Sequence, residues 1–226
     1  VKACLFDRQL RQTALTSREY ALRTHGVCAE AEPQIYLDAA AQCILSLPAE
    51  ARARVCAVAL TTQGETLICV DRQGRALRPA IVWLDSRAEA QAARLAAVLD
   101  RQRFYERTGL PELSGALPLA KLLWLREQEP EIWARTDKFL LLEDYLMLWL
   151  TGRAVTEKSL LTSTGYFDLQ SDDYWDEALT LAELDRTRLP QALACGSVVG
   201  PVLPELAETL GLPASACVVT GAMDQT

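Results

Sequence analysis

The sequence has little from which a metal centre or a disulfide framework could be built. It contains one histidine, His25, and seven cysteines, none of them in a Cys-x-x-Cys pair. A structural zinc site needs four Cys or His ligands at short, regular spacings. We therefore expect that the chain binds no metal by itself and that its cysteines stay reduced, as in a cytoplasmic protein.

Long apolar runs and an excess of positive charge are also missing. The most apolar stretch, 139–150, is interrupted by Glu143 and Asp144 and is shorter than the roughly 20 residues of a membrane span. Lysine and arginine number 23 against 30 acidic residues, a net charge of −7. This balance disfavours nucleic acid and anionic membranes as partners. A dinucleotide enzyme is disfavoured too, because no Gly-x-Gly-x-x-Gly follows a predicted strand.

What is present indicates a globular domain with a large core. Half of the 226 residues are apolar and 23% are charged. A chain of this size can bury roughly 70% of the surface that it exposes when unfolded. Apolar residues alternate as in strands in the first third and recur with a helical period from Ser86 onward. These patterns predict one α/β domain with a mixed sheet flanked by helices.

The individual elements follow from apolar periodicity and from the prolines and glycines at their ends. Ser86 and Glu89 have the spacing of a capping box at a helix start, and Gly152 is placed to end another helix. The uninterrupted apolar run 55–60 predicts a central strand. The other predicted strands are 1–6 and 12–18, paired as a hairpin, 65–70, 80–84 and 216–220, and the predicted helices are 33–47, 90–99, 118–128, 140–150 and 204–211.

Three short polar segments at strand ends are candidates for a binding site. Gln63, Gly64 and Glu65 lie between two apolar strands, where a glycine lets a ligand approach the backbone. The Gln amide both donates and accepts hydrogen bonds and the carboxylate accepts, which suits a ligand rich in hydroxyl groups. Taken alone, the segment is equally compatible with a polar turn.

Trp83 and Asp85 form the second candidate. An aromatic ring packs on the C–H face of a sugar, while a carboxylate accepts hydrogen bonds from its hydroxyl groups. The alternative is a buried core tryptophan followed by an Asp at a helix N-terminus, which the helix dipole favours.

Asp224, in Gly221-Ala222-Met223-Asp224, is the third candidate. A carboxylate on a glycine-containing loop beyond a strand end can serve as a catalytic base. The alternative is an ordinary exposed Asp in a turn. His25 has no partner at a useful spacing and is interpreted as a solvated loop residue.

The order of several motifs carries more information than any one of them. Along the chain these are Gln63-Gly64-Glu65, Trp83-Leu84-Asp85-Ser86-Arg87, Lys121-Leu122-Leu123-Trp124, Asp144-Tyr145-Leu146, Leu150-Thr151-Gly152, Ser163-Thr164-Gly165-Tyr166-Phe167-Asp168 and Gly221-Ala222-Met223-Asp224. Over essentially its whole length, the chain resembles the N-terminal domain of the FGGY carbohydrate kinases, the family of glycerol kinase, xylulokinase, ribulokinase and fuculokinase.

The resemblance implies an actin-like, ribonuclease-H-like α/β fold and a kinase reaction. In the family, two such domains close over a cleft, the N-terminal one holding a sugar or polyol and the C-terminal one most of the ATP, which acts with Mg²⁺. The resemblance further implies that Asp224 accepts the proton of the sugar hydroxyl. It places Gln63, Gly64, Glu65 and Trp83 along the polyol site, with Asp85 adjacent.

The chain also departs from the family pattern. Family members begin with a strand and an Asp-x-Gly-Thr-type phosphate loop, and this sequence starts just after that place and lacks the C-terminal ATP domain. We therefore expect residues 1–226 to be the sugar-binding domain alone, inactive as a kinase without the rest. Glycerol kinases carry Arg in place of Gly64 and Tyr in place of Ala116, which predicts a pocket larger than one for glycerol.

Two other function classes stay open at this point. A non-catalytic carbohydrate-binding or regulatory relative could share the fold, although the presence of Asp224 speaks against it. An actin-like assembly ATPase would need the phosphate loops but not the Gln63–Glu65 and Trp83–Asp85 segments. The expected partners are a sugar or polyol and ATP, and a homodimer is left open.

Overall fold

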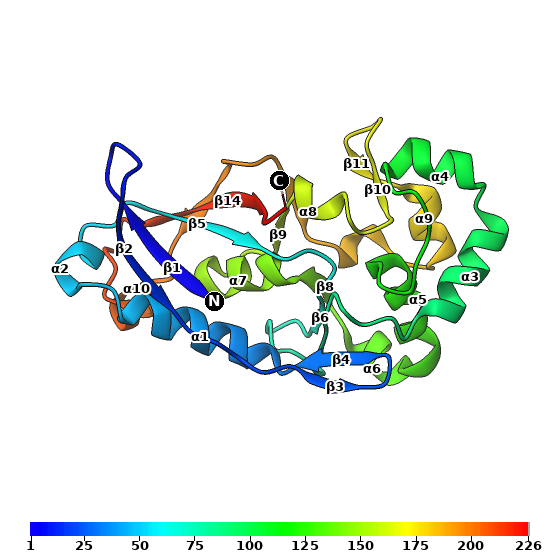
Figure 1. Ribbon diagram of the computed structural model, residues 1–226, viewed down its shortest axis with the longest axis horizontal. Helices are drawn as coiled ribbons and strands as arrows, with labels where there is room; N and C mark the ends of the chain where they lie inside the picture. Colours follow the sequence, from blue (N-terminus) through cyan, green and yellow to red (C-terminus); the bar gives the residue numbers. More distant parts are fainter. Residues whose placement is uncertain (226) are drawn as a thin grey trace.

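The computed structural model describes residues 1–225. Figure 1 shows an elongated molecule in which β1, β2, β5 and β14 lie toward one end and α3, α4, α5 and α9 toward the other, with α7 between them. The strands are β1 Lys2–Phe6, β2 Gln12–Ser17, β3 Arg23–His25, β4 Cys28–Ala31, β5 Ala57–Thr62, β6 Leu67–Val70, β7 Ala80–Ile81, β8 Lys138–Leu141, β9 Val155–Glu157, β10 Phe167–Asp168, β11 Asp173–Tyr174, β12 Gln191–Leu193, β13 Val198–Pro201 and β14 Cys217–Met223. The helices are α1 Pro33–Leu45, α2 Ala49–Arg52, α3 Glu89–Val98, α4 Arg101–Thr108, α5 Pro118–Gln128, α6 Pro130–Arg135, α7 Leu142–Thr151, α8 Lys158–Leu161, α9 Asp176–Leu181 and α10 Pro204–Leu210, with a 3-10 turn η1 at Arg186–Arg188.

Two sheets organise the part of the fold that carries the candidate residues. One has five strands in the order β3-β4-β7-β6-β8, and the other has three in the order β13-β14-β5, with β14 and β5 parallel. The β1–β2 hairpin forms a separate antiparallel pair. The fold is therefore mixed α/β, as predicted.

Helix α7 joins the two sheets. It follows β8 directly and packs against β5, β13 and β14. Its apolar side chains enter two hydrophobic clusters, one with β13, β14 and α10 and the other with α1 and the five-stranded sheet. A third cluster surrounds α5 and includes the aromatic residues of β10 and β11. Because every face of α7 meets protein, its two acidic residues, Glu143 and Asp144, are buried as well.

Most elements marked by proline and glycine are confirmed. Helices α1, α5 and α10 each have a proline in the first turn. Proline is favoured there because its missing N–H has no partner in a helix anyway. Helices α7 and α10 end at Gly152 and Gly211, both in the left-handed region. The β1–β2 hairpin is confirmed too.

Other expectations are wrong in ways that have a physical cause. Glu89 accepts a hydrogen bond from the Gly115 N–H, 2.8 Å away, so no capping box with Ser86 starts α3. Leu140 and Leu141 belong to β8 because they pair with β6, so α7 begins later than predicted. The run 55–60 is shifted to β5 at Ala57–Thr62, which lies at the edge of its sheet rather than in the centre in the described residues. His25 is exposed, as expected, but lies in β3.

Within residues 1–225, no helix combines the length and the apolar character that crossing a bilayer requires.

Candidate functional site

A β-bulge near the end of β14 sets the position of Asp224. Val219 pairs with Ala59 and Ala222 with Thr61, so two residues of β14, Thr220 and Gly221, lie opposite one residue of β5. A bulge of this kind shifts the phase of a strand and re-aims the side chains that follow it. After the bulge the pairing resumes, and the Asp224 N–H donates to the Thr62 carbonyl at 3.0 Å.

Gly221 is required where the bulge approaches β5. A Cβ atom on Gly221 would lie 1.5 Å from the Leu60 carbonyl oxygen. The contact is with the backbone of the neighbouring strand, which cannot rotate away as a side chain could. The glycine of the Gly221–Asp224 motif therefore has a steric reason that the sequence pattern alone did not reveal.

The Gln63–Glu65 loop lies against the same strand end. Gly64 is buried, and a Cβ atom on it would lie 2.6 Å from the Ser163 Oγ and 3.0 Å from the Met223 Sδ. Met223 precedes Asp224 in β14, so close packing at Gly64 joins the loop to the strand end that bears the carboxylate. The side chains of Ser163 and Met223 thus border the space beside the Gly64 Cα. That Gly64 leaves room for a sugar larger than glycerol stays a prediction.

Thr66 connects the Gln63–Glu65 loop to Trp83. Its hydroxyl accepts hydrogen bonds from the Gln63 side-chain amide at 2.7 Å and from the Trp83 N–H at 3.2 Å. Trp83 itself is 44% exposed. It is therefore not the buried core tryptophan of the alternative interpretation, and its ring is free to contact a ligand.

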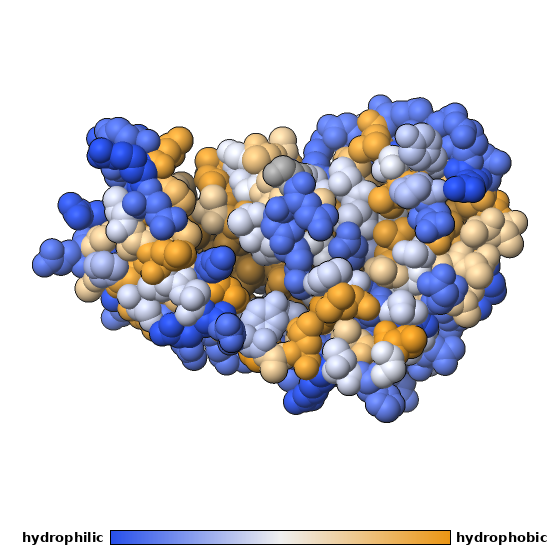
Figure 2. Space-filling view, viewed as in Figure 1, coloured by the Kyte–Doolittle hydropathy of each residue, from blue (hydrophilic) through white to orange (hydrophobic). Residues whose placement is uncertain are grey.

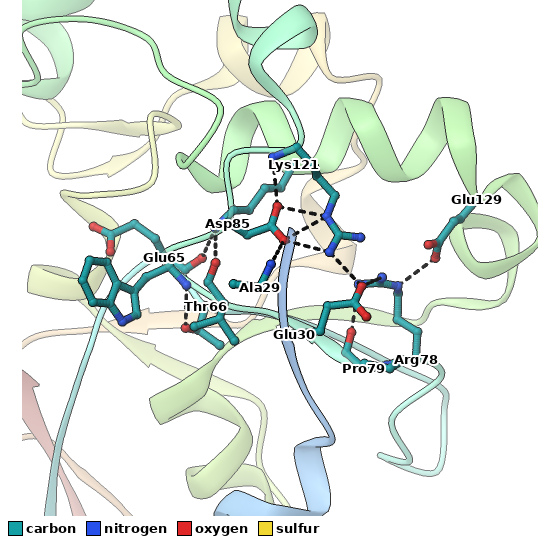
Figure 3. A network of polar contacts seen from close by, with 12 residues as sticks. Ala29, Glu30, Glu65, Thr66, Arg78, Pro79, Asp85, Lys121 and Glu129 are labelled. Atoms are coloured by element: carbon teal, nitrogen blue, oxygen red, sulfur yellow. Dashed lines mark hydrogen bonds and ion pairs between the residues drawn. The ribbon is translucent and has the colours of Figure 1, made fainter. Parts of the chain in front are cut away.

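Glu65 has an unusual backbone that a buried lysine stabilises. Its φ of 53° lies in the left-handed region, which non-glycine residues seldom adopt. The Lys121 Nζ donates to the Glu65 carbonyl at 2.9 Å and to the Val82 carbonyl at 3.0 Å. The same ammonium group therefore bonds to both the Glu65 loop and the turn before Trp83. Figure 3 shows Lys121 beside Glu65 and Asp85.

Lys121 has no solvent-exposed surface, and this changes its acidity. Burial disfavours the charged ammonium, and it lowers the pKa of Lys121 to about 8, although the carboxylates of Asp85 and Glu65 act in the opposite direction. Lys121 belongs to a motif of the sequence, but its position under both candidate segments could not be inferred from spacing. We regard it as a residue that sets the geometry of the site.

Asp85 is held within an ion-pair network and does not face solvent. Its carboxylate is fully buried and accepts hydrogen bonds from the Ala29 N–H at 2.6 Å and from the Arg87 guanidinium at 2.7 Å. Burial opposes the ionisation of this carboxyl, but the bonds from Arg87 and Ala29 outweigh it, and the pKa of Asp85 lies below its usual value. Asp85 therefore supports the turn after Trp83 from behind.

The network extends away from the candidate site along β4 and the β6–β7 connection. Glu30 forms ion pairs with Arg87 at 2.8 Å and with Arg78 at 2.7 Å, and Arg78 also pairs with Glu129. Figure 3 shows Glu30, Arg78 and Glu129 on the side of Asp85 opposite Glu65. The Arg87 guanidinium lies 4.8 Å from the centre of the Trp124 ring. Lys121 and Trp124, one turn apart on α5, thus both contact the segment that carries Trp83.

Asp224, by contrast, is exposed at the end of β14. Its backbone N–H donates to the Thr62 carbonyl, and Thr62 directly precedes the Gln63–Glu65 loop. The structure therefore brings five of the predicted residues, Gln63, Gly64, Glu65, Trp83 and Asp224, onto connected loops, with Asp85 beneath them.

Comparisons with known proteins identify the fold. A family model described as the N-terminal domain of the FGGY family of carbohydrate kinases matches residues 1–226. The chain belongs to this family. It is 31% identical to the xylulose kinase of Lactococcus lactis over 99% of this chain and 45% of that protein, and 27% identical to the gluconokinase of Bacillus subtilis over 76% of this chain and 33% of that protein.

Solved structures of FGGY kinases have the same fold. A ligand-bound xylulose kinase from Lactobacillus acidophilus superimposes with a TM-score of 0.92 at 26% identity, over 99% of this chain and 46% of that one. A xylulose kinase from Rhodospirillum rubrum gives 0.93 at 28% identity, with the same coverage. The chain thus spans less than half the length of the FGGY relatives that it matches. The predicted fold class is confirmed.

Glu65 offers a test that separates a side-chain role from a backbone role. If Glu65 binds a sugar hydroxyl in the full-length protein, Glu65→Gln should raise the sugar KM by about tenfold, because a hydrogen bond to a charged group contributes about 1.5–3 kcal/mol, while kcat changes less. Glu65→Gly should raise KM similarly yet leave the melting temperature intact, since glycine adopts a positive φ without strain. Steady-state kinetics and thermal melts check both, and an unchanged KM in both variants would show that the carboxylate does not contact the sugar.

Proposed function

We propose that this domain binds the sugar of an ATP-dependent carbohydrate kinase and that Asp224 is the general base. One observation supports the proposal: the Asp224 N–H bonds to the Thr62 carbonyl and Gly64 lies against Met223, so the exposed Asp224 follows the strand end that the Gln63–Glu65 loop contacts. Membership of the FGGY family supports the kinase reaction. The γ-phosphate of ATP would be transferred to a sugar hydroxyl.

The role of each residue follows from its chemistry. The amide of Gln63 and the carboxylate of Glu65 would hydrogen-bond sugar hydroxyls, and the exposed face of Trp83 would pack against the C–H surface of the sugar. The carboxylate of Asp224 is the group that would accept the hydroxyl proton. Phosphoryl transfer depends mainly on positioning and on neutralising charge, so a correctly held weak base is sufficient.

ATP and Mg²⁺ would be held largely outside residues 1–225. Carboxylate oxygens suit Mg²⁺, and the exposed carboxylate of Asp224 is a chemically fitting ligand. Among the described residues, however, no cluster of three Asp, Glu, His or Cys side chains could hold a metal ion. When bound, the metal would neutralise the developing phosphate charge. The domain's own part is to orient the sugar and to take up its proton.

The open edges of two sheets suggest how this domain is completed. In residues 1–225, β1 pairs only with β2, and β5 pairs only with β14. Figure 2 shows a hollow with hydrophobic side chains between the end that carries the β1–β2 hairpin and the rest of this face. Partly buried apolar side chains of α1 and β5 pack against the hydrophobic cluster of β13, β14 and α10: Ala41, Ile44, Val58 and Leu60. We propose that a further strand of the full-length kinase fills this space, and that the isolated domain does not turn over ATP.

The substrate is proposed to be larger than glycerol. Xylulose kinases and gluconokinases are among the relatives of this chain. Gly64 and the half-buried Ala116 stand where glycerol kinases have Arg and Tyr, and both replacements favour a longer sugar. Reduced cysteines, all seven without a disulfide partner, support a cytoplasmic location.

A sugar panel tests the proposed function. In an ADP-release assay with the full-length protein, a ketopentose such as xylulose or a sugar acid such as gluconate is expected to give at least about tenfold higher kcat/KM than glycerol, because unfilled polar contacts reduce transition-state binding. If glycerol proved the best substrate, the pocket-size argument would be wrong. Sugar binding without any turnover would indicate a non-catalytic relative instead.

A further inference from the structure

A buried glutamate lies beneath the bulge that positions Asp224. The extra residue of the bulge, Gly221, has no partner opposite it on β5, and its N–H donates to the Glu143 Oε1 at 3.3 Å. Glu143 is in the first turn of α7. The contact therefore joins a central helix of the domain to the point where β14 changes phase.

The next residues of β14 are held by other elements. The Met223 N–H donates to the Ser159 hydroxyl of α8 at 2.9 Å, and the Asp224 N–H donates to the Thr62 carbonyl of β5. Three backbone amides within four residues are thus tied to three different elements. Of these hydrogen bonds, the one to Glu143 is at the bulge itself. A displacement of the backbone at Gly221 would therefore also displace Met223 and Asp224.

The surroundings of Glu143 favour its neutral form. The side chain has no exposed surface, and its Oε2 has no hydrogen-bond partner among the described residues. Two more buried carboxyl groups act on it electrostatically, Asp144 on the same helix and Glu157 at the end of β9. Burial, reinforced by Asp144 and Glu157, raises the pKa of Glu143 to about 9, although the Gly221 N–H acts in the opposite direction.

We propose that Glu143, in its protonated form, is a positioning residue of the kinase: it holds the Gly221 bulge and through it aims the Asp224 carboxylate at the sugar hydroxyl. The inference rests on the proposed role of Asp224. A neutral carboxyl group keeps a carbonyl oxygen that accepts from Gly221. Ionisation would instead put a negative charge in a buried place beside two other carboxyl groups and displace the contact. A displacement of about 1 Å at a reacting group can cost about 10²-fold in rate.

Two variants of the full-length protein test this role. The readout is the pH dependence of kcat, which a mere loss of stability would not change in the same way. Glu143→Gln keeps a carbonyl acceptor and cannot ionise, so kcat should stay within about threefold of wild type. In wild type, kcat should fall as the pH rises through about 9, because the neutral form of Glu143 is the active one. Glu143→Gln should lack this step and keep only the decline near pH 8 that deprotonation of Lys121 causes. Glu143→Leu leaves Gly221 unpaired and should lower kcat at least about tenfold with the sugar KM little changed.

A control variant and the Asp224→Asn variant complete the experiment. Asp176→Asn on α9 is the control, because this side chain is 85% exposed and lies outside the candidate site, so its kcat and its alkaline decline should match wild type. An identical alkaline decline in wild type and Glu143→Gln would overturn the inference, even if Glu143→Leu failed to fold. If Asp224→Asn were fully active, the proposed base would fail instead, whatever the Glu143 variants showed.

Discussion

Replacing Asp224 by Asn in the full-length protein is expected to lower kcat by about 10²–10⁴-fold, the usual contribution of a general base. Asn has almost the same shape and can still hydrogen-bond a sugar hydroxyl, but it cannot take up the proton and carries no charge to orient the hydroxyl. The Asp224 side chain is exposed and its backbone N–H is bonded to Thr62, so the substitution disturbs no packing. The sugar KM and the melting temperature should therefore remain near the wild-type values.

The measurement is steady-state ADP release at saturating sugar, with a thermal melt for each variant. Asp176→Asn is a suitable control, because this acid on α9 has a side chain that is 85% exposed and lies outside the candidate site. It should leave kcat unchanged. A well-folded Asp224→Asn protein with kcat within about tenfold of wild type would refute the catalytic assignment.

Gly221→Ala is expected to have the largest effect on stability. A methyl group 1.5 Å from the Leu60 carbonyl oxygen cannot be accommodated unless β14 moves away from β5. Overpacking of a well-packed site costs typically about 1–3 kcal/mol, and a clash with backbone belongs at the upper end of that range or above it. Because β14 also carries Asp224, kinase activity should fall together with the free energy of unfolding.

Urea unfolding of the full-length protein checks this prediction, with Gly200→Ala as the matched control. Gly200 lies in β13, which pairs with β14, and a Cβ atom there would approach only the Arg153 side chain, at 3.9 Å. The control should change the free energy of unfolding by less than about 1 kcal/mol. Equal effects of the two substitutions would mean that the bulge is not under the steric constraint described.

Much of the candidate site could be predicted because its residues lie in short local motifs. Gln63–Glu65, Trp83 and Asp224 each follow a strand or begin a turn, and such positions can be recognised from hydrophobic pattern and polar residue type. Their order along the chain pointed to the FGGY family, which the family model confirmed. Helices that begin with Pro33, Pro118 and Pro204 were predictable for the same reason, since proline acts on its own backbone.

The residues that hold these motifs together could not be found in the same way. Lys121 and Glu143 are charged residues in apolar helices, and a sequence pattern assigns such residues to solvent. In the structure both are fully buried, one bridging two carbonyl groups and the other beneath a bulge. Their partners lie 56 and 78 residues away along the chain, so no local rule could connect them.

The amino-acid sequence, read without coordinates, established an α/β domain of the FGGY kinases, its main helices and the polar segments that bear the candidate residues. These are properties of local periodicity and residue type. Only the tertiary structure decided that Gly64 packs against the side chains of Ser163 and Met223, that Asp85 is buried, and that β14 has a bulge at Gly221. Each of these features depends on which residues from distant parts of the chain become neighbours. Those neighbours are determined only when the helices and strands pack together.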